Sequence, residues 1–203
     1  MPHTPLWQSE DFWRKVAVFV TAGSAVLLML LTFDTLSQTA AGRGRVPAYT
    51  VINQQIGYRF DSERNMSVPV IGDPAPLFGK VLTEADAEAL VTHGKKTVQA
   101  KNCMNCHTLL GNGAYYAPDL TKAWLDPQWQ DMVDLTESDS REEAMAKFLQ
   151  HPEQYATNAR MMPDLGITPD EAKAVVAFLK WMSAIDTNGF PAHFPTRAQG
   201  DRS

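Results

Sequence analysis

One long apolar segment dominates the start of the chain. Val16–Phe33 contains 18 successive residues without a charge. A helix rises 1.5 Å per residue, so this segment would be roughly 27 Å long, enough to cross the hydrocarbon core of a bilayer. It is preceded by residues typical of a membrane interface: Trp7, Phe12, Trp13, Arg14 and Lys15. We therefore expect a cytoplasmic tail over residues 1–15 and a transmembrane anchor helix over residues 16–34, with the remaining chain on the other side of the membrane.

A cleaved secretory signal is the alternative interpretation of this segment. Thr39-Ala40-Ala41 has the small residues of a cleavage site. The apolar run is, however, longer than the core of a typical signal peptide. The pattern therefore favours an anchor that stays attached.

Residues 35–81 have a less regular pattern. Thr50–Ile52 and Ser67–Ile71 have a strand-like composition, and glycines and the Asp73–Pro76 cluster interrupt them. This composition predicts either an extended linker or a small periplasmic embellishment that lies against a partner. A partly ordered tether is an equally good interpretation.

A helical pattern begins after Leu82. Thr83 is suited to cap a helix because the acidic Asp86 follows three positions later. Glycine inside a helix costs about 1 kcal/mol relative to alanine, so Gly94 predicts close contact with a second helix that crosses over it. The apolar face that contains this glycine runs to about Lys101 and consists of Ala87, Leu90, Val91 and Val98.

The second helix is expected near the other end of the chain. Thr168, Pro169 and Glu171 combine an N-cap, proline at the first helical position and the acid of a capping box. Apolar residues then recur at helical spacing: Ala172, Val175, Val176, Phe178, Leu179, Trp181 and Met182.

The overall composition is that of a folded protein without a nucleic-acid partner. The 203 residues are 44% hydrophobic and 20% charged, which excludes a disordered chain. The formal net charge of −5 and the isoelectric point near 5.5 argue against binding to nucleic acid, which requires a basic surface.

Cys103-Met104-Asn105-Cys106-His107 has the Cys-x-x-Cys-His spacing of a c-type haem attachment site. Each thiol can form a thioether to one porphyrin vinyl group, and the adjacent imidazole becomes the proximal iron ligand. A redox-active dithiol needs no histidine at this position, and a zinc site needs further ligands at suitable spacing. Because the chain has two cysteines, this assignment leaves none for a structural disulfide.

Helices before and after a haem motif, packed across each other, form the scaffold of small cytochromes c. We therefore expect a mainly α protein, with one N-terminal transmembrane helix followed by a periplasmic class I-type cytochrome c domain. That domain is expected over residues 82–190, with a C-terminal tail over residues 191–203. The expected topology agrees with the chemistry, because c-type haems are attached outside the bacterial inner membrane.

The sixth iron ligand is expected to be a methionine in the loop before the second helix. A thioether there would reach the face of the haem opposite His107. Met162 is favoured because Pro163 fixes the loop geometry after it, whereas Met161 remains open. Of the other histidines, His3 lies on the expected cytoplasmic tail, His93 on the first helix and His193 in the C-terminal tail. His151, followed by a proline, is an alternative ligand, although a single surface histidine more often has no ligand role.

Acidic residues cluster between the haem motif and this methionine: Asp126, Asp131, Asp134, Glu137, Asp139, Glu142 and Glu143. Such a cluster could attract a basic electron donor through long-range electrostatics. An ordinary solvated surface explains the same pattern.

The motifs together resemble the cytochrome c subunit of bacterial cytochrome c-dependent nitric oxide reductase. The similarity is carried by the haem motif and the run to Leu120, by Arg160–Pro163, by Phe178–Trp181 and by Ile185–Asn188. The run Thr-Leu-Leu-Gly-x-Gly-Ala-Tyr beyond the haem motif is the part specific to that family. The segment over residues 43–80 is longer than the family pattern.

The resemblance implies a subunit of an enzyme complex that has no catalytic centre of its own. It would accept electrons from a soluble periplasmic cytochrome c or cupredoxin. It would pass them to a large multi-helix inner-membrane subunit that holds haem b and a haem b/non-haem iron centre. There, 2 NO, 2 electrons and 2 protons give N2O and water.

The resemblance also implies particular ligands. Met162 matches the axial methionine of the family. The carbonyl of Gly113 and the side chain of Tyr115 match positions that bind a calcium ion at the interface with the large subunit. From the residues alone, Gly113 would belong to a turn and Tyr115 to haem-pocket packing.

Three other functions are compatible with the same haem motif. A stand-alone membrane-tethered electron shuttle would need no tight partner. A monohaem subunit of a related haem-copper oxygen reductase would supply electrons for the reduction of O2 instead of NO. A haem-based gas sensor would need an open or easily displaced axial position.

Overall fold

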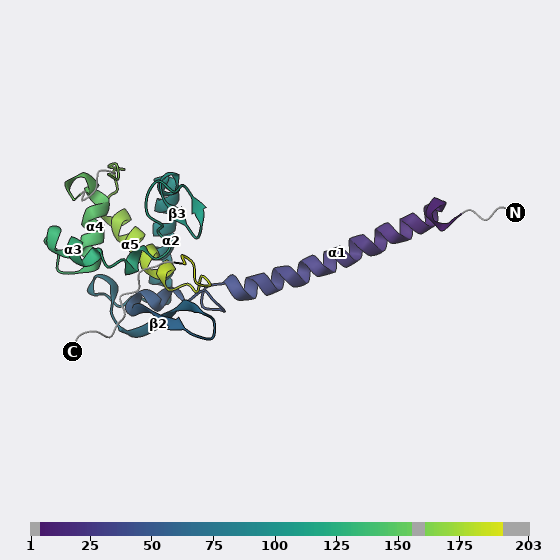
Figure 1. Ribbon diagram of the computed structural model, residues 1–203, viewed down its shortest axis with the longest axis horizontal. Helices are drawn as coiled ribbons and strands as arrows, with labels where there is room; N and C mark the ends of the chain where they lie inside the picture. Colours follow the sequence, from purple (N-terminus) through teal and green to yellow (C-terminus); the bar gives the residue numbers. More distant parts are fainter. Residues whose placement is uncertain (1–4, 156–160, 193–203) are drawn as a thin grey trace.

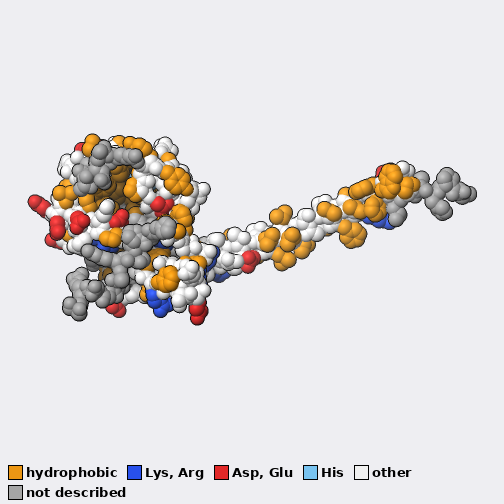
Figure 2. Space-filling model, in the orientation of Figure 1, with side chains coloured by type: hydrophobic (Ala, Val, Ile, Leu, Met, Phe, Trp, Pro, Cys, Tyr) orange, Lys and Arg blue, Asp and Glu red, His pale blue; other side chains and the backbone are white. Residues whose placement is uncertain are grey.

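The computed structural model describes residues 5–155 and 161–192, and Figure 1 shows a folded domain from which one long helix projects. That helix, α1, spans Glu10–Thr39. None of its residues is buried, and hydrophobic side chains line its surface (Figure 2). Among the described residues, α1 is the helix that is long and apolar enough to cross a membrane.

The helix α1 extends beyond the uncharged segment at both ends. Ser9 caps its N-terminus by accepting a hydrogen bond from the Phe12 backbone N–H at 3.4 Å. The negative charges of Glu10 and Asp11 lie in the first turn, where they interact favourably with the positive end of the helix dipole. Local capping therefore sets the start of the helix, whereas the uncharged residues within it form the segment suited to lipid.

In the described residues, the α-helices of the folded domain are α2 over Glu84–Ala100, α3 over Trp129–Leu135, α4 over Arg141–Gln150 and α5 over Pro169–Ser183. The predicted caps of α2 and α5 are confirmed. The Thr83 side chain accepts a hydrogen bond from the Asp86 N–H at 3.2 Å. Thr168 and Glu171 form a complete capping box at the start of α5.

Helices α2 and α5 cross at Gly94. A Cβ atom at this position would overlap the carbonyl of Ala174, and it would lie 2.8 Å from the Cβ of Phe178. Only glycine therefore allows the two backbones to approach this closely. The predicted contact of Gly94 with a second helix is confirmed.

The hydrophobic core surrounds this crossing. Within α5, buried residues cover most of the helix surface, so α5 is the central element of the domain. The core residues of α2, α4 and α5 include Ala87, Val91, Val98, Met145, Val175, Val176, Phe178, Leu179 and Met182.

Residues 49–79 form an ordered addition to the helical domain. Strand β1 (Gln54–Asp61) pairs with strand β2 (Met66–Pro74) in an antiparallel hairpin. The strand-like composition of Ser67–Ile71 thus corresponds to a strand. Thr50–Ile52 instead lies in a 3-10 helix over Tyr49–Asn53, because the buried side chains of that turn pack into the domain core.

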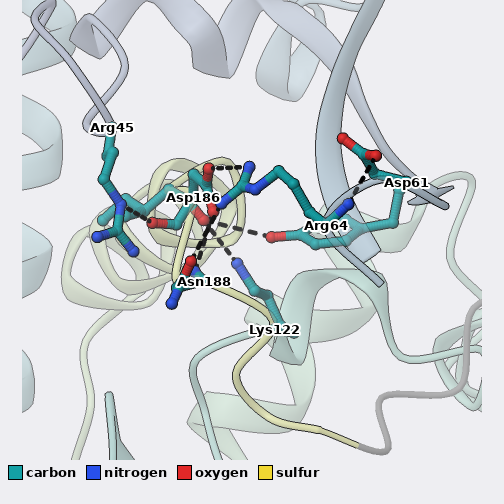
Figure 3. Close-up of polar contacts among 8 residues, drawn as sticks. Arg45, Asp61, Arg64, Lys122, Asp186 and Asn188 are labelled. Atoms are coloured by element: carbon teal, nitrogen blue, oxygen red, sulfur yellow. Dashed lines mark hydrogen bonds and ion pairs between the residues drawn. The ribbon is translucent and has the colours of Figure 1, made fainter. Parts of the chain in front are cut away.

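Polar contacts join the hairpin and the segment after α1 to the residues that follow α5 (Figure 3). The Arg64 guanidinium donates to Asp186 Oδ2 at 2.8 Å and to Asn188 Oδ1 at 3.1 Å. Arg45 exchanges two bonds with Asp186: its Nε donates to the Asp186 carbonyl at 3.1 Å, and its carbonyl accepts from the Asp186 N–H at 3.0 Å. Lys122 Nζ donates to the Ile185 carbonyl at 2.8 Å.

The predicted fold class is confirmed at this level. The chain is mainly helical, with a long apolar helix at the N-terminal end and a helical domain after it. The C-terminal residues 193–203 lie outside the described part of the chain.

Candidate haem site

The Cys-x-x-Cys-His motif begins directly after α2. Asn102 adopts a left-handed backbone conformation with φ of 54°, which ends the helix. Cys103–Asn105 then forms one 3-10 turn, and the His107 N–H donates to the Cys103 carbonyl at 3.0 Å. This tight turn places the two thiols and the imidazole within one short segment.

Both thiols are free and half-buried. Burial raises the pKa of the Cys103 thiol above its ordinary value. No cluster of three or more His, Cys, Asp and Glu residues suited to a metal exists among residues 5–155 and 161–192.

His107 is oriented by a backbone carbonyl. Its Nδ1 lies 2.7 Å from the Pro118 carbonyl oxygen. Because a carbonyl only accepts, Nδ1 carries the proton and Nε2 keeps its lone pair for a metal. A hydrogen bond of this kind fixes the ring and increases the basicity of the ligand. Pro118 is thus a site residue that the sequence did not reveal, since a carbonyl group has no signature in residue type.

The loop after the motif folds back onto it. The Ala114 N–H donates to the Met104 carbonyl at 3.0 Å, and the Ala117 N–H donates to the Cys106 carbonyl at 2.8 Å. At Gly113 the backbone φ is 120°, and a Cβ atom would overlap the His107 carbonyl. Glycine is therefore required for this return of the chain.

A partly buried polar network holds the position of Pro118. Thr108 Oγ1 donates to Asp119 Oδ2 at 2.6 Å, and the Thr121 N–H donates to Asp119 Oδ1 at 2.8 Å. Thr121 Oγ1 in turn accepts from the Leu110 N–H at 2.8 Å. Both threonines are buried, and Asp119 is half-buried. Asp119 thereby links Thr108, which directly follows His107, to Thr121, which lies beyond Pro118.

The two candidate methionines differ in their surroundings. Met162 is half-buried and packs against the hydrophobic core, whereas Met161 is 59% exposed. Arg160 lies outside the described residues, as do His3 and His193. His93 is exposed on α2, and the exposed His151 lies 4.0 Å from Glu153.

Lys101 joins the haem motif to residues 161–168, the loop before α5 that we call the methionine loop. Its Nζ donates to the carbonyls of Leu165 at 3.3 Å and Gly166 at 2.9 Å, and it lies 3.5 Å from Glu171 Oε2. Lys101 stands two positions before Cys103, and Leu165 stands three positions after Met162. This lysine therefore couples the two sides of the candidate site.

The residues present fit a covalently attached haem. The thiols of Cys103 and Cys106 have the required spacing and form no disulfide. The adjacent His107 has its Nδ1 bonded to the Pro118 carbonyl, so its Nε2 is available to the iron. When bound, the haem supplies a one-electron redox centre.

The two residues expected to bind calcium lie at the surface. Gly113 is part of the short strand β4 (Asn112–Gly113), which pairs with β3 (Thr108–Leu109). Tyr115 is 82% exposed. Calcium takes six to eight oxygen ligands, so these two groups could hold an ion only together with ligands from elsewhere.

The acidic residues between the motif and the methionine loop gather over α3 and α4 (Figure 2). Some of them accept hydrogen bonds from backbone N–H groups. Asp126 accepts from the Gln128 N–H at 2.9 Å, and Glu142 accepts from the Phe78 N–H at 3.3 Å. The surface is acidic, and some of its carboxylates also accept hydrogen bonds from the backbone.

Comparison with known proteins identifies the domain. The profile of the cytochrome c family matches residues 91–183. The nitric oxide reductase C subunit of Paracoccus denitrificans is 31% identical over 112 residues, which is 55% of this chain and 71% of that protein. The protein of the same name from Stutzerimonas stutzeri is 29% identical over 114 residues, covering 56% and 73%. The one from Halomonas halodenitrificans is 27% identical over 103 residues, covering 51% and 65%.

The region matched by the cytochrome c profile includes the haem motif, the methionine loop and the crossing of α2 with α5. The expected cytochrome c domain is thereby confirmed, and such a domain implies one covalently bound haem c. By its motifs, its fold and these similarities, the chain belongs to the family of nitric oxide reductase C subunits.

Proposed function

We propose that this chain is the electron-transfer subunit of a membrane-bound nitric oxide reductase. The observation that carries the proposal is the haem motif with His107 oriented by Pro118, on a chain related to the C subunits of nitric oxide reductases. The chain would accept electrons from a soluble donor and pass them to a catalytic subunit that converts two NO molecules to N2O and water.

The proposed haem linkages are thioethers from Cys103 and Cys106, with His107 and Met162 as axial iron ligands. The half-buried position of Met162 against the core supports its choice over the exposed Met161. The thioether of methionine is a soft ligand that favours ferrous iron and gives a higher reduction potential than a second histidine. Such a potential suits a relay that receives electrons and gives them up again.

The proposed location of the domain is the periplasmic face of the bacterial inner membrane. Helix α1 would act as the anchor, with Arg14 and Lys15 on the cytoplasmic side. The rest of the described chain buries none of the residues of α1, as expected for a helix that contacts lipid or other membrane helices.

The proposed partner is a large multi-helix subunit with haem b and a haem b/non-haem iron centre. In the loop beside the haem motif, the exposed fractions of Leu110, Tyr115 and Tyr116 are 45%, 82% and 57%. Exposed aromatic residues next to a redox site suit an interface with such a subunit. A calcium ion held by the Gly113 carbonyl, Tyr115 and groups of the partner would lie at this interface.

The proposed donor is a soluble periplasmic cytochrome c or cupredoxin. The acidic surface over α3 and α4 would attract a donor with a basic face. This attraction weakens as salt screens the charges, so donor oxidation should slow at high ionic strength.

Purification of the intact membrane complex tests the proposal. Covalent c-type haem, b-type haem and non-haem iron should be present together, and the preparation should consume NO. Replacement Tyr115→Phe should lower bound calcium or weaken the association with the partner while leaving the c-type haem spectrum unchanged. An isolated monomer would favour a stand-alone shuttle, turnover of O2 without NO would favour an oxygen reductase, and a ferrous spectrum altered by CO would favour a gas sensor.

A further inference from the structure

A cavity of about 380 Å³ lies between the β-hairpin and the helical part of the domain. Its polar lining comes from Gln54 and Gln55 of β1, from Arg141 at the start of α4 and from Lys180 of α5. None of the haem-site residues lines this cavity. Among the described residues, its lining includes two cations and no carboxylate.

Lys180 brings a buried positive charge to the cavity. The residue is only 3% exposed, and its Nζ donates one hydrogen bond to the Ala75 carbonyl at 2.9 Å. Within the described part of the chain it forms no ion pair with a carboxylate. An ammonium group has three donors, and a buried charge without a counterion is energetically unfavourable.

Arg141 brings a second positive charge to the same place. Its Nη1 donates to the Trp124 carbonyl at 2.8 Å, and its Cζ lies 5.7 Å from the centre of the Trp124 ring. Lys180 Nζ lies 5.1 Å from the centre of that ring. The indole stabilises both cations, but it does not neutralise either of them.

The acidic groups that act on these two cations are engaged elsewhere. Glu142 accepts from the Phe78 N–H at 3.3 Å, and Asp126 accepts from the Gln128 N–H at 2.9 Å. Neither carboxylate lines the cavity. The cavity lining itself therefore contains no carboxylate among the described residues, and both carboxylates act on the two cations only from outside it.

A β-bulge lies at the edge of the cavity. Gln54 pairs with Pro74 and Ile56 pairs with Ile71, so the single residue Gln55 faces two residues of β2. Bulges redirect side chains and occur often beside functional sites. The carboxamides of Gln54 and Gln55, each with N–H donors, line the cavity beside the bulge together with the two cations.

We propose that this cavity binds a small oxyanion of the size of phosphate or a short-chain carboxylate, held by Lys180 and Arg141 and by the amides of Gln54 and Gln55. The planar guanidinium can bind two oxygens of one anion, and charge-assisted hydrogen bonds are strong in a half-buried site. The anion would connect the hairpin to α4 and α5, so binding would stabilise the hairpin against the helical domain.

Calorimetric titration of the haem-loaded full chain in detergent tests this proposal. Inorganic phosphate and acetate would be titrated separately, at constant ionic strength and in a buffer without other oxyanions. Saturable binding of at least one of them to a single site, with Kd below about 1 mM, is expected. The absence of saturable binding of both would overturn the proposal.

Two variants locate the site. Lys180→Met and Arg141→Gln should each weaken binding by about tenfold or more, because each removes a charge-assisted contact. Lys173→Met is the matched control, since Lys173 lies exposed on the same helix. Binding that survives unchanged in both site variants, or that the control weakens equally, would show that the anion binds elsewhere. Circular dichroism and the haem spectrum would verify that each variant is folded.

Discussion

A side chain at Gly94 in α2 would occupy the same space as the carbonyl of Ala174 in α5. The contact matters for the haem site, because α2 ends just before Cys103 and α5 begins shortly after Met162. The distance between these two helices thus sets how the two sides of the site face each other.

Gly94→Ala should destabilise the domain by about 1–3 kcal/mol or more, since the added methyl group forces the helices apart. Denaturant unfolding of the haem-loaded chain measures this change. Gly23→Ala is a suitable control, because a Cβ atom at Gly23 has no neighbour within 4 Å. Equal stability of the Gly94→Ala variant and the natural chain would contradict the close crossing.

Lys101→Met should loosen the methionine loop. The substitution removes the bonds to the Leu165 and Gly166 carbonyls, a loss of about 1–2 kcal/mol for a partly exposed lysine. We expect easier displacement of the methionine ligand, measured as CO binding to the ferrous haem and as a lower reduction potential. Lys96→Met, which changes an exposed lysine within α2, the helix that Lys101 directly follows, should leave both quantities unchanged. A Lys101→Met variant indistinguishable from that control would remove the coupling role.

Met162→His should keep the haem six-coordinate and lower its reduction potential by a large margin, because imidazole favours ferric iron more than a thioether does. Turnover of the complex should slow accordingly. Met162→Ala should abolish the sulfur-to-iron charge-transfer band, and Met161→Ala should retain it. The opposite pattern in the two alanine variants would assign the ligand to Met161.

The buried Lys180 predicts an unusual dependence of stability on pH. Burial lowers the pKa of Lys180 to about 8, partly offset by the nearby carboxylate of Glu142. In the unfolded chain the pKa is near its ordinary value, so between these two values the unfolded state binds more protons than the folded state. Stability should therefore increase as the pH rises above 8.

Denaturant unfolding at pH 8 and pH 9.5, without added oxyanion, measures this effect. Lys180 should contribute an increase of about 1 kcal/mol over this interval. The increase should be smaller in Lys180→Met than in the natural chain and unchanged in Lys173→Met. Lys122, whose pKa burial also lowers to about 8, should produce a similar increase that remains in both variants. An identical pH dependence of the natural chain and Lys180→Met would contradict the assignment.

Local sequence signals predicted the main helices and their crossing. Thr83 and Thr168 cap α2 and α5 as their neighbours in sequence indicate, and Gly94 marks the helix contact. These features are predictable because capping and close approach depend on a few specific residue types. The haem motif is equally local, since its two thiols and imidazole lie within five residues.

Contacts between distant residues were not predictable in the same way. Arg64 and Asp186 are 122 positions apart, and no periodicity connects them. The β-branched run Thr50–Ile52 suggested a strand, but burial of Val51 and Ile52 fixes a 3-10 turn instead. Pro118 orients His107 through its backbone carbonyl, a group that every residue type carries.

Rapid mixing of the pre-reduced intact complex with NO tests the central claim most directly. The absorbance of the c-type haem reports its oxidation state, and N2O is measured in the same samples. The proposal predicts that the c-type haem is oxidised as N2O forms, at a rate that supports steady turnover. Formation of N2O at the full steady-state rate while the c-type haem stays reduced would contradict the proposed relay.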